Sequence, residues 1–96
     1  DNCFITYRKF KDDSTFVYDM FSSEEVRGTG AMLSFCKKFV GKMSEDGIKN
    51  VYGTTEEDTN GWERSDKVLR DFGFKFIGKD PNKKYINNYC LEIKGN

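Results

Sequence analysis

The chain has 96 residues, which suffice for one domain with a modest hydrophobic core but not for two domains. Sixteen basic and sixteen acidic side chains cancel, and no lysine or arginine block stands out, so neither nucleic acid nor an anionic membrane is indicated as a partner. Histidine is absent, which excludes Ser-His-Asp and Cys-His catalysis and nearly all zinc and non-haem iron sites. We therefore expect no bound metal.

The sequence predicts an intracellular location, in the cytoplasm or the nucleus. No apolar run is long enough to span a bilayer, and no segment resembles a signal peptide. Cys3, Cys36 and Cys90 are odd in number and far apart, a pattern typical of buried reduced thiols rather than of a disulfide framework. The first residue is Asp1 rather than methionine, so we expect a minimal protein or one trimmed at its front.

The first part of the chain predicts two strands. Residues Cys3–Phe10 alternate in the manner of a strand, and Lys11–Ser14 form a polar break after it. Residues Thr15–Ser22 are apolar at both odd and even positions, which predicts a strand with layers packed against both of its faces. The short connection between the two strands favours a hairpin.

The remainder predicts two helices and three strands. From Gly30 to about Met43 the apolar residues recur at helical spacing and form one stripe. Gly73 is placed to end the second helix in a left-handed conformation. After the first helix we expect a strand, an acidic loop, a helix and a closing hairpin, at Ile48–Thr54, Thr55–Gly61, Trp62–Phe72, Phe74–Lys79 and Lys84–Lys94. The predicted order is β-β-α-β-α-β-β, an α+β fold in a single domain over residues 1–96.

The connection between the second strand and the first helix carries the clearest functional pattern. Gly28 and Gly30 allow positive φ and let a ligand approach the backbone closely. The start of a helix leaves unpaired N–H groups beside the positive end of its dipole, which suits a phosphate or pyrophosphate. A dinucleotide fingerprint would need glycine where Leu33 stands, and no Walker loop exists. The alternative is a glycine-softened helix start without a ligand.

Two patches resemble the GNAT superfamily of N-acetyltransferases. The run E-V-R-G-T-G from Glu25 to Gly30 is similar to its pyrophosphate loop, which has Gln or Arg first and Gly, x, Gly or Ala last. With the residues around it, this run resembles E-Q-V-(R/K)-G-Y-G-(A/T) of the histone acetyltransferase branch. The run S-D-K-V-L-R-D-F-G-F from Ser65 to Phe74 is similar to the N-x-x-S-x-x-V-L-x-x-x-G-F helix of the ribosomal-protein acetyltransferase branch. Together they extend the resemblance over roughly residues 16–93.

Two positions depart from the family pattern. Glu25 stands where the family has Gln or Arg, which puts a carboxylate near an anionic ligand unless its side chain points away. Trp62 stands where the family has Asn, and Asn60 is the nearest replacement.

The resemblance implies a central mixed, splayed β-sheet flanked by helices, with acetyl-CoA between the strand Thr15–Ser22 and the strand starting at Ile48. It implies that backbone groups near the middle of the former strand bind the pantetheine arm and polarise the thioester, and that the loop amides hold the pyrophosphate. The cofactor-binding residues implied are Tyr18, Met20, Phe21, Val26, Arg27, Gly28, Thr29, Gly30, Ala31 and Asn60. The acceptor implied is a primary amine, and the branch favours a protein lysine. Oligomeric state is not predicted.

The implied reaction needs a base and an acid. A lysine amine of pKa about 10.4 is almost fully protonated at pH 7, so a base or a desolvating site must help. The family's strand glutamate falls on Ser14 here, and its usual tyrosine acid falls on Leu69. Ser65 is therefore the predicted proton donor to the leaving thiolate, with a serine in the first turn or at the N-cap of the helix as the alternative. The candidate bases are Asp19, Glu56 and Glu57.

Two other functions are weighed against the transferase. The first is a coenzyme A-binding or interaction module of the same fold that lacks transfer activity, which the substitution at Glu25 and the missing glutamate and tyrosine favour. The second is an unrelated α/β interaction domain. Binding of coenzyme A separates the second from the others, and acetyl transfer separates the first from an enzyme.

Overall fold

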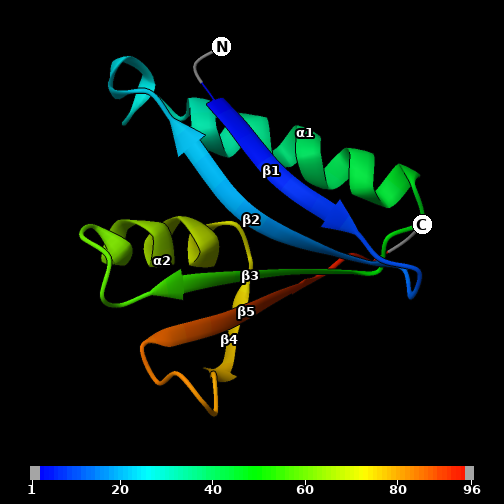
Figure 1. The fold of residues 1–96 in the computed structure, drawn as a ribbon. Helices are drawn as coiled ribbons and strands as arrows, with labels where there is room; N and C mark the ends of the chain where they lie inside the picture. The colour runs from blue at the N-terminus through cyan, green and yellow to red at the C-terminus, as the bar shows by residue number, and fades with distance from the viewer. Residues whose placement is uncertain (1–2, 95–96) are drawn as a thin grey trace.

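The computed structural model describes residues 3–94, which form a five-stranded mixed sheet with two α-helices (Figure 1). The elements are β1 Cys3–Lys9, β2 Ser14–Ser22, the 3₁₀ turn η1 Glu24–Val26, α1 Ala31–Glu45, β3 Asn50–Glu56, α2 Trp62–Asp71, β4 Lys75–Lys79 and β5 Ile86–Glu92. The predicted order of strands and helices is confirmed. None of the helices described is long and apolar enough to cross a membrane.

The third strand begins and ends two residues later than predicted. Thr55 and Glu56 were expected in the acidic loop, but they pair with Asn87 and Ile86 of β5. This antiparallel ladder supplies backbone partners that the local sequence does not reveal. β5 itself starts at Ile86 rather than Lys84, because the preceding residues form a turn.

The sheet has the order β1-β2-β3-β5-β4, with β2 and β3 as its one parallel pair among the described residues. Pairing between β2 and β3 covers only three positions, from Ser14 opposite Asn50 to Phe16 opposite Tyr52. Beyond them the two strands diverge, as Figure 1 shows. The predicted splayed, mixed sheet is thereby confirmed.

Both helices cover the same face of the sheet. Met43 of α1 and Leu69 of α2 belong to one buried cluster with Val51 of β3 and Tyr89 of β5. A Cβ atom added to Gly53 would meet the Leu69 side chain at 3.7 Å, so α2 packs directly over β3. Burial of these apolar side chains is the main source of stability for a small domain of this kind.

The opposite face of the sheet corrects one expectation. The residues Thr15–Ser22 were predicted to have layers on both sides, and Thr15 and Val17 are indeed buried under the helices. Tyr18 and Phe21, however, are 55% and 41% exposed. No helix among residues 3–94 covers this second face, so the apolar residues on it remain half open to solvent.

The cysteines differ in burial. All three are free thiols, as predicted, but only Cys36 is buried, whereas Cys3 and Cys90 are half-buried on strands. Burial raises the pKa of Cys36 to about 12, which makes its thiolate form rare at neutral pH.

Met43 provides a test of this core. Its side chain is fully buried between α1 and the sheet, with its sulfur 3.4 Å from the Thr15 hydroxyl. Replacement by alanine leaves a cavity, and we expect Met43→Ala to lower the free energy of unfolding by about 2–4 kcal/mol in urea titrations. Ile77→Ala is the control, because Ile77 is 57% exposed and its change should stay within about 0.5 kcal/mol.

Candidate functional site

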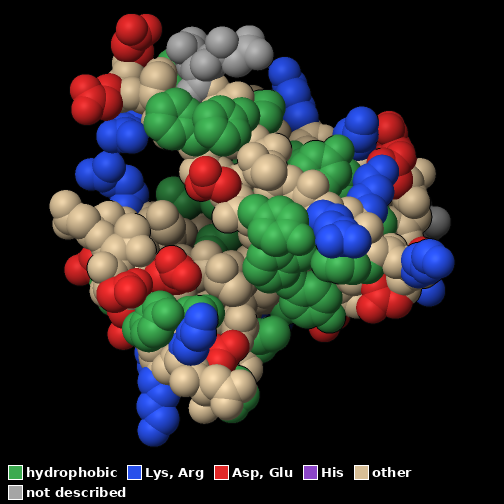
Figure 2. Space-filling model, viewed as in Figure 1, with side chains coloured by type: hydrophobic (Ala, Val, Ile, Leu, Met, Phe, Trp, Pro, Cys, Tyr) green, Lys and Arg blue, Asp and Glu red, His purple; other side chains and the backbone are tan. Residues whose placement is uncertain are grey.

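The divergence of β2 and β3 opens a groove of about 890 Å³. One bank consists of β2 and the loop after it, and the other consists of β3 and α2. Figure 2 shows a hollow at the left of the molecule with basic side chains beside its opening. The volume lies within the range of about 300–1,000 Å³ that is usual for cofactor sites.

The groove brings together most of the predicted site residues. From the predicted set, the residues that line it are Tyr18, Asp19, Met20, Phe21, Val26, Arg27, Gly28, Gly30, Asn60 and Ser65. They come from β2, from the connection between β2 and α1 over residues 23–30, which we call the glycine loop, from the loop before α2, and from α2 itself. Thr29, Ala31, Glu56 and Glu57 lie outside the lining.

β2 carries an irregularity inside the groove. Val17 pairs with Tyr7 and Asp19 pairs with Thr6, so Tyr18 is an extra residue with no partner on β1. Such a bulge bends a strand and re-aims its backbone groups. On the other side, the pairing of β2 with β3 stops at Phe16, so within residues 3–94 no strand pairs with the edge of β2 that faces the groove. The backbone donors and acceptors of this edge are therefore open to a ligand.

The loop between β2 and α1 has the geometry expected of its glycines. Gly28 and Gly30 have φ values of 81° and 83°, and a Cβ atom added to either would meet nothing within 4 Å. Gly30 is the N-cap of α1 and has no side chain that could accept a hydrogen bond from the first amides of the helix. The first amides of α1 thus stand beside the positive end of the helix dipole, at the groove.

The Thr29 side chain forms hydrogen bonds within the loop and does not line the groove. Its hydroxyl donates to the carbonyl oxygen of Val26 and accepts a hydrogen bond from the amide of Ala31 at 3.3 Å. Arg27 is tied to the end of β2, since its Nε donates to the carbonyl oxygen of Ser22 at 3.2 Å. The side chain of Glu25, whose direction the sequence left open, is exposed and does not line the groove.

Ser65 occupies an exposed position on the bank formed by α2. The N-cap of α2 is Gly61, and Ser65 is the fourth helical residue. The N-cap alternative for this serine is therefore wrong, whereas its position agrees with the first-turn alternative. A hydroxyl at this position faces both the groove and the solvent.

The carboxylates proposed as bases differ in their surroundings. Asp19 lines the groove, on the segment of β2 next to the bulge. Glu57 instead accepts hydrogen bonds from Lys79 at 2.7 Å and from the Asn87 amide at 2.9 Å, and these bonds hold its pKa below the usual range. A carboxylate with a lowered pKa is a weaker base. Glu56 lies at the exposed end of β3, outside the lining.

A buried polar network that the sequence analysis missed holds α2 in place. The buried Tyr89 hydroxyl donates to Asp66 of α2 and lies 2.9 Å from the Thr55 hydroxyl of β3. Burial alone would raise the pKa of Asp66, but hydrogen bonds from Tyr89 and Arg70 outweigh it and lower the pKa. The spacing of Asp66 and Arg70 suggests a helical ion pair in the sequence. The contact of Asp66 with Tyr89, and of Tyr89 with Thr55, depends on the fold.

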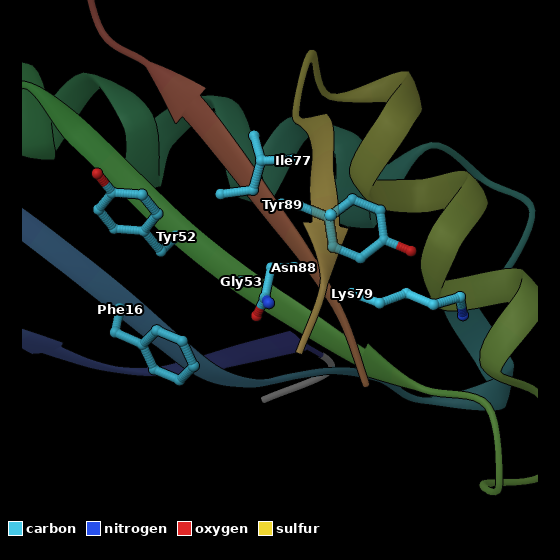
Figure 3. Close-up of a pocket in the computed structure, with 8 residues that line it drawn as sticks. Phe16, Tyr52, Gly53, Ile77, Lys79, Asn88 and Tyr89 are labelled. Atoms are coloured by element: carbon cyan, nitrogen blue, oxygen red, sulfur yellow. The ribbon is translucent and has the colours of Figure 1, made fainter. Parts of the chain in front are cut away.

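A second, smaller hollow of about 280 Å³ lies on the open face of the sheet. Figure 3 shows its lining, which includes Phe16 of β2, Tyr52 of β3 and Ile77 of β4. Its one charged side chain, Lys79, is paired with Glu57. The hollow lacks the glycine loop and the groove carboxylates, so we assign the chemistry to the larger groove.

Comparisons with known proteins agree with this geometry at the level of the fold. No protein-family model matches the sequence, and the search of curated proteins finds no match. The structure, in contrast, is similar to a GNAT-family acetyltransferase from Staphylococcus aureus, with a TM-score of 0.81 and 16% identity over 97% of this chain and 60% of that one.

Two further solved structures have the same arrangement. The ribosomal-protein-S18-alanine N-acetyltransferase of Escherichia coli has a TM-score of 0.74 and 9% identity over 99% of this chain and 63% of that one. An acetyltransferase from Thermus thermophilus has a TM-score of 0.76 and 13% identity over 94% of this chain and 55% of that one. The chain thus has the fold of GNAT-family acetyltransferases, and it spans about three-fifths of their length.

The lowered pKa of Asp66 predicts a dependence of stability on pH. Because this pKa is lower in the folded protein than in the unfolded chain, the stabilisation is present above about pH 3.9 and is lost as the pH falls through the folded-state pKa. We expect Asp66→Asn to lower the free energy of unfolding at pH 7, and the difference from the unsubstituted protein to shrink toward pH 3. Urea unfolding across this pH range measures it, with Asp58→Asn, at an exposed loop position, as the control.

Proposed function

We propose that this chain is a GNAT-type N-acetyltransferase domain that moves an acetyl group from acetyl-CoA to a primary amine. The observation that carries the proposal is the groove at the divergence of β2 and β3, which ends at the glycine loop and the start of α1. The likeness of the fold to solved acetyltransferases supports it. The enzyme would act inside the cell, where acetyl-CoA is available.

The residues present fit coenzyme A at both ends of the groove. The unpaired edge of β2 between Tyr18 and Phe21 offers backbone donors and acceptors to the amides of a pantetheine arm, in the manner of an added strand. In the loop from Val26 to Ala31, the amides of Gly28 and Gly30 have no hydrogen-bond partner among residues 3–94 and would donate to a pyrophosphate beside the N-terminus of α1. A backbone N–H near the bulge would polarise the thioester carbonyl and stabilise the charge that develops on its oxygen.

The proton transfers are assigned to groove residues. Asp19 is our first candidate for the base that accepts the proton of the attacking amine, directly or through water, because it lines the groove. Glu57 ranks behind it, since Lys79 and Asn87 engage its carboxylate. The amine nitrogen forms the new bond to the acetyl carbon, and the carbon–sulfur bond breaks. The Ser65 hydroxyl donates its proton to the thiolate and takes up another from solvent.

The acceptor proposed is a lysine side chain of a protein, on the likeness of the loop sequence to the histone acetyltransferase branch. A coenzyme A-binding module without transfer activity is the second candidate. The observation that favours it is the absence of a strand glutamate and of a helix tyrosine at the matching positions, Ser14 and Leu69.

Two measurements separate these candidates. Calorimetry with acetyl-CoA tests binding, and mass spectrometry of proteins and small amines incubated with the chain and acetyl-CoA tests transfer. Binding with acetylated lysines supports the proposal in full. Binding without any acetylated product selects the module, and absence of binding contradicts both.

The glycine loop gives a sharp test of the pyrophosphate site. We expect Gly28→Ala combined with Gly30→Ala to weaken coenzyme A binding at least about tenfold, because Cβ atoms would occupy the open space beside the loop amides and disfavour its left-handed backbone. Gly47→Ala is the control for backbone strain at one such position, because its φ is 80° and it lies after α1, outside the groove. Equal affinities for the two folded variants would contradict the assignment.

Ser65 gives a test of the proton donor. A group that acts mainly in the transition state should affect kcat and leave the affinity for acetyl-CoA almost unchanged. We expect Ser65→Ala to lose at least about 30-fold in kcat. Stability should hold, because Ser65 is exposed and does not cap α2. Steady-state kinetics and thermal unfolding of the same variant measure both effects, and an unchanged kcat would remove Ser65 from the mechanism.

A further inference from the structure

The bank of the groove formed by α2 carries a cation that the resemblance did not indicate. Arg64 lines the groove, is exposed, and makes no ion pair or side-chain hydrogen bond with residues 3–94. The other two basic residues of α2 are compensated, since Lys67 pairs with Asp71 and Arg70 pairs with Asp66. Arg64 thus holds its charge toward the groove without a partner among the described residues.

The topology places Arg64 at the same end of the groove as the glycine loop. β2 and β3 run parallel, so their carboxyl ends point the same way. The glycine loop follows β2, and α2 follows β3 through residues 57–61. Because Arg64 is in the first turn of α2, it lies at the loop end, whereas Asp71 lies about 10 Å further along the helix axis.

The charges at this end of the groove favour an anion. Arg27 lines the loop bank and Arg64 lines the opposite bank, with Glu24 as the one carboxylate of the lining in the loop. Asp19 lies three residues before the end of β2, about 10 Å from it along the strand. Guanidinium groups bind phosphate oxygens with two parallel N–H donors, which gives both strength and orientation.

We propose that Arg64 binds the 3′-phosphate of the ribose of coenzyme A. This inference rests on the proposed function. The backbone amides of the glycine loop serve the pyrophosphate, and the 3′-phosphate is the next anionic group along the molecule. Arg64 stands across the groove from that loop and supplies a charge that no backbone amide provides. It would therefore make the site selective for phosphorylated coenzyme A over 3′-dephospho-coenzyme A.

The experiment measures by calorimetry the affinities for coenzyme A and 3′-dephospho-coenzyme A of the unsubstituted 96-residue protein and of two variants. We expect the unsubstituted protein to bind coenzyme A about tenfold more tightly than 3′-dephospho-coenzyme A. Arg64→Gln should bring this ratio close to one, chiefly by weakening the binding of coenzyme A. Arg8→Gln is the matched control, because it removes the same group from an exposed site on β1, outside the groove, and should keep the original ratio.

Each outcome has one interpretation. A tenfold ratio that persists in Arg64→Gln overturns the inference, as does a ratio of one in the unsubstituted protein. A loss of affinity for both ligands by the same factor in Arg64→Gln also overturns it, since the residue would then act on a group that the two ligands share. If the unsubstituted protein binds neither ligand, the proposed function fails before Arg64 is tested. Circular dichroism spectra of the variants establish that they are folded.

Discussion

The short parallel contact between β2 and β3 is the constraint on which the rest of the structure depends. After Phe16 and Tyr52 the strands part, and the sheet becomes two halves with one helix each. α1 packs on the β1–β2 half, where the rings of Phe39 and Tyr7 are edge-on with their centroids 5.1 Å apart. α2 is held to the β3–β5–β4 half by Asp66 and Tyr89. Each helix is fixed to its own half, which keeps the space between the halves open.

The open space explains why backbone groups, rather than titratable side chains, dominate the proposed site. A strand that loses its neighbour exposes a row of donors and acceptors, and the bulge at Tyr18 re-aims part of that row. The same parallel connection brings the starts of both helices to one end of the groove, with a glycine, Gly30 or Gly61, as the N-cap residue of each. An elongated ligand with amides in its middle and phosphates at one end suits this arrangement.

The side chains refine the catalytic assignment. The groove contains Asp19 and Ser65 but not Glu57, whose carboxylate is committed to Lys79 and Asn87. Glu25, the substitution that argued against an anionic ligand, does not line the groove. Glu25 therefore does not place its charge in the groove, where Glu24 is the carboxylate of the loop lining. The matching positions of the family base and acid are still Ser14 and Leu69. The distinction between a transferase and a binding module consequently depends on how Asp19 and Ser65 act.

The sequence by itself determined the order of the elements, the glycine loop and the apolar stripe of α1, because spacing and glycine conformation are local properties of the chain. It could not determine that β2 lacks a layer on one face, since apolar residues alternate there whether or not a partner covers them. Nor could it place Glu57 outside the groove, or join Asp66, Tyr89 and Thr55, which are far apart in the sequence. Those contacts exist only once the β3–β5 ladder has set its register, and that register depends on residues 30 (Glu56 and Ile86) to 42 (Asn50 and Glu92) positions apart.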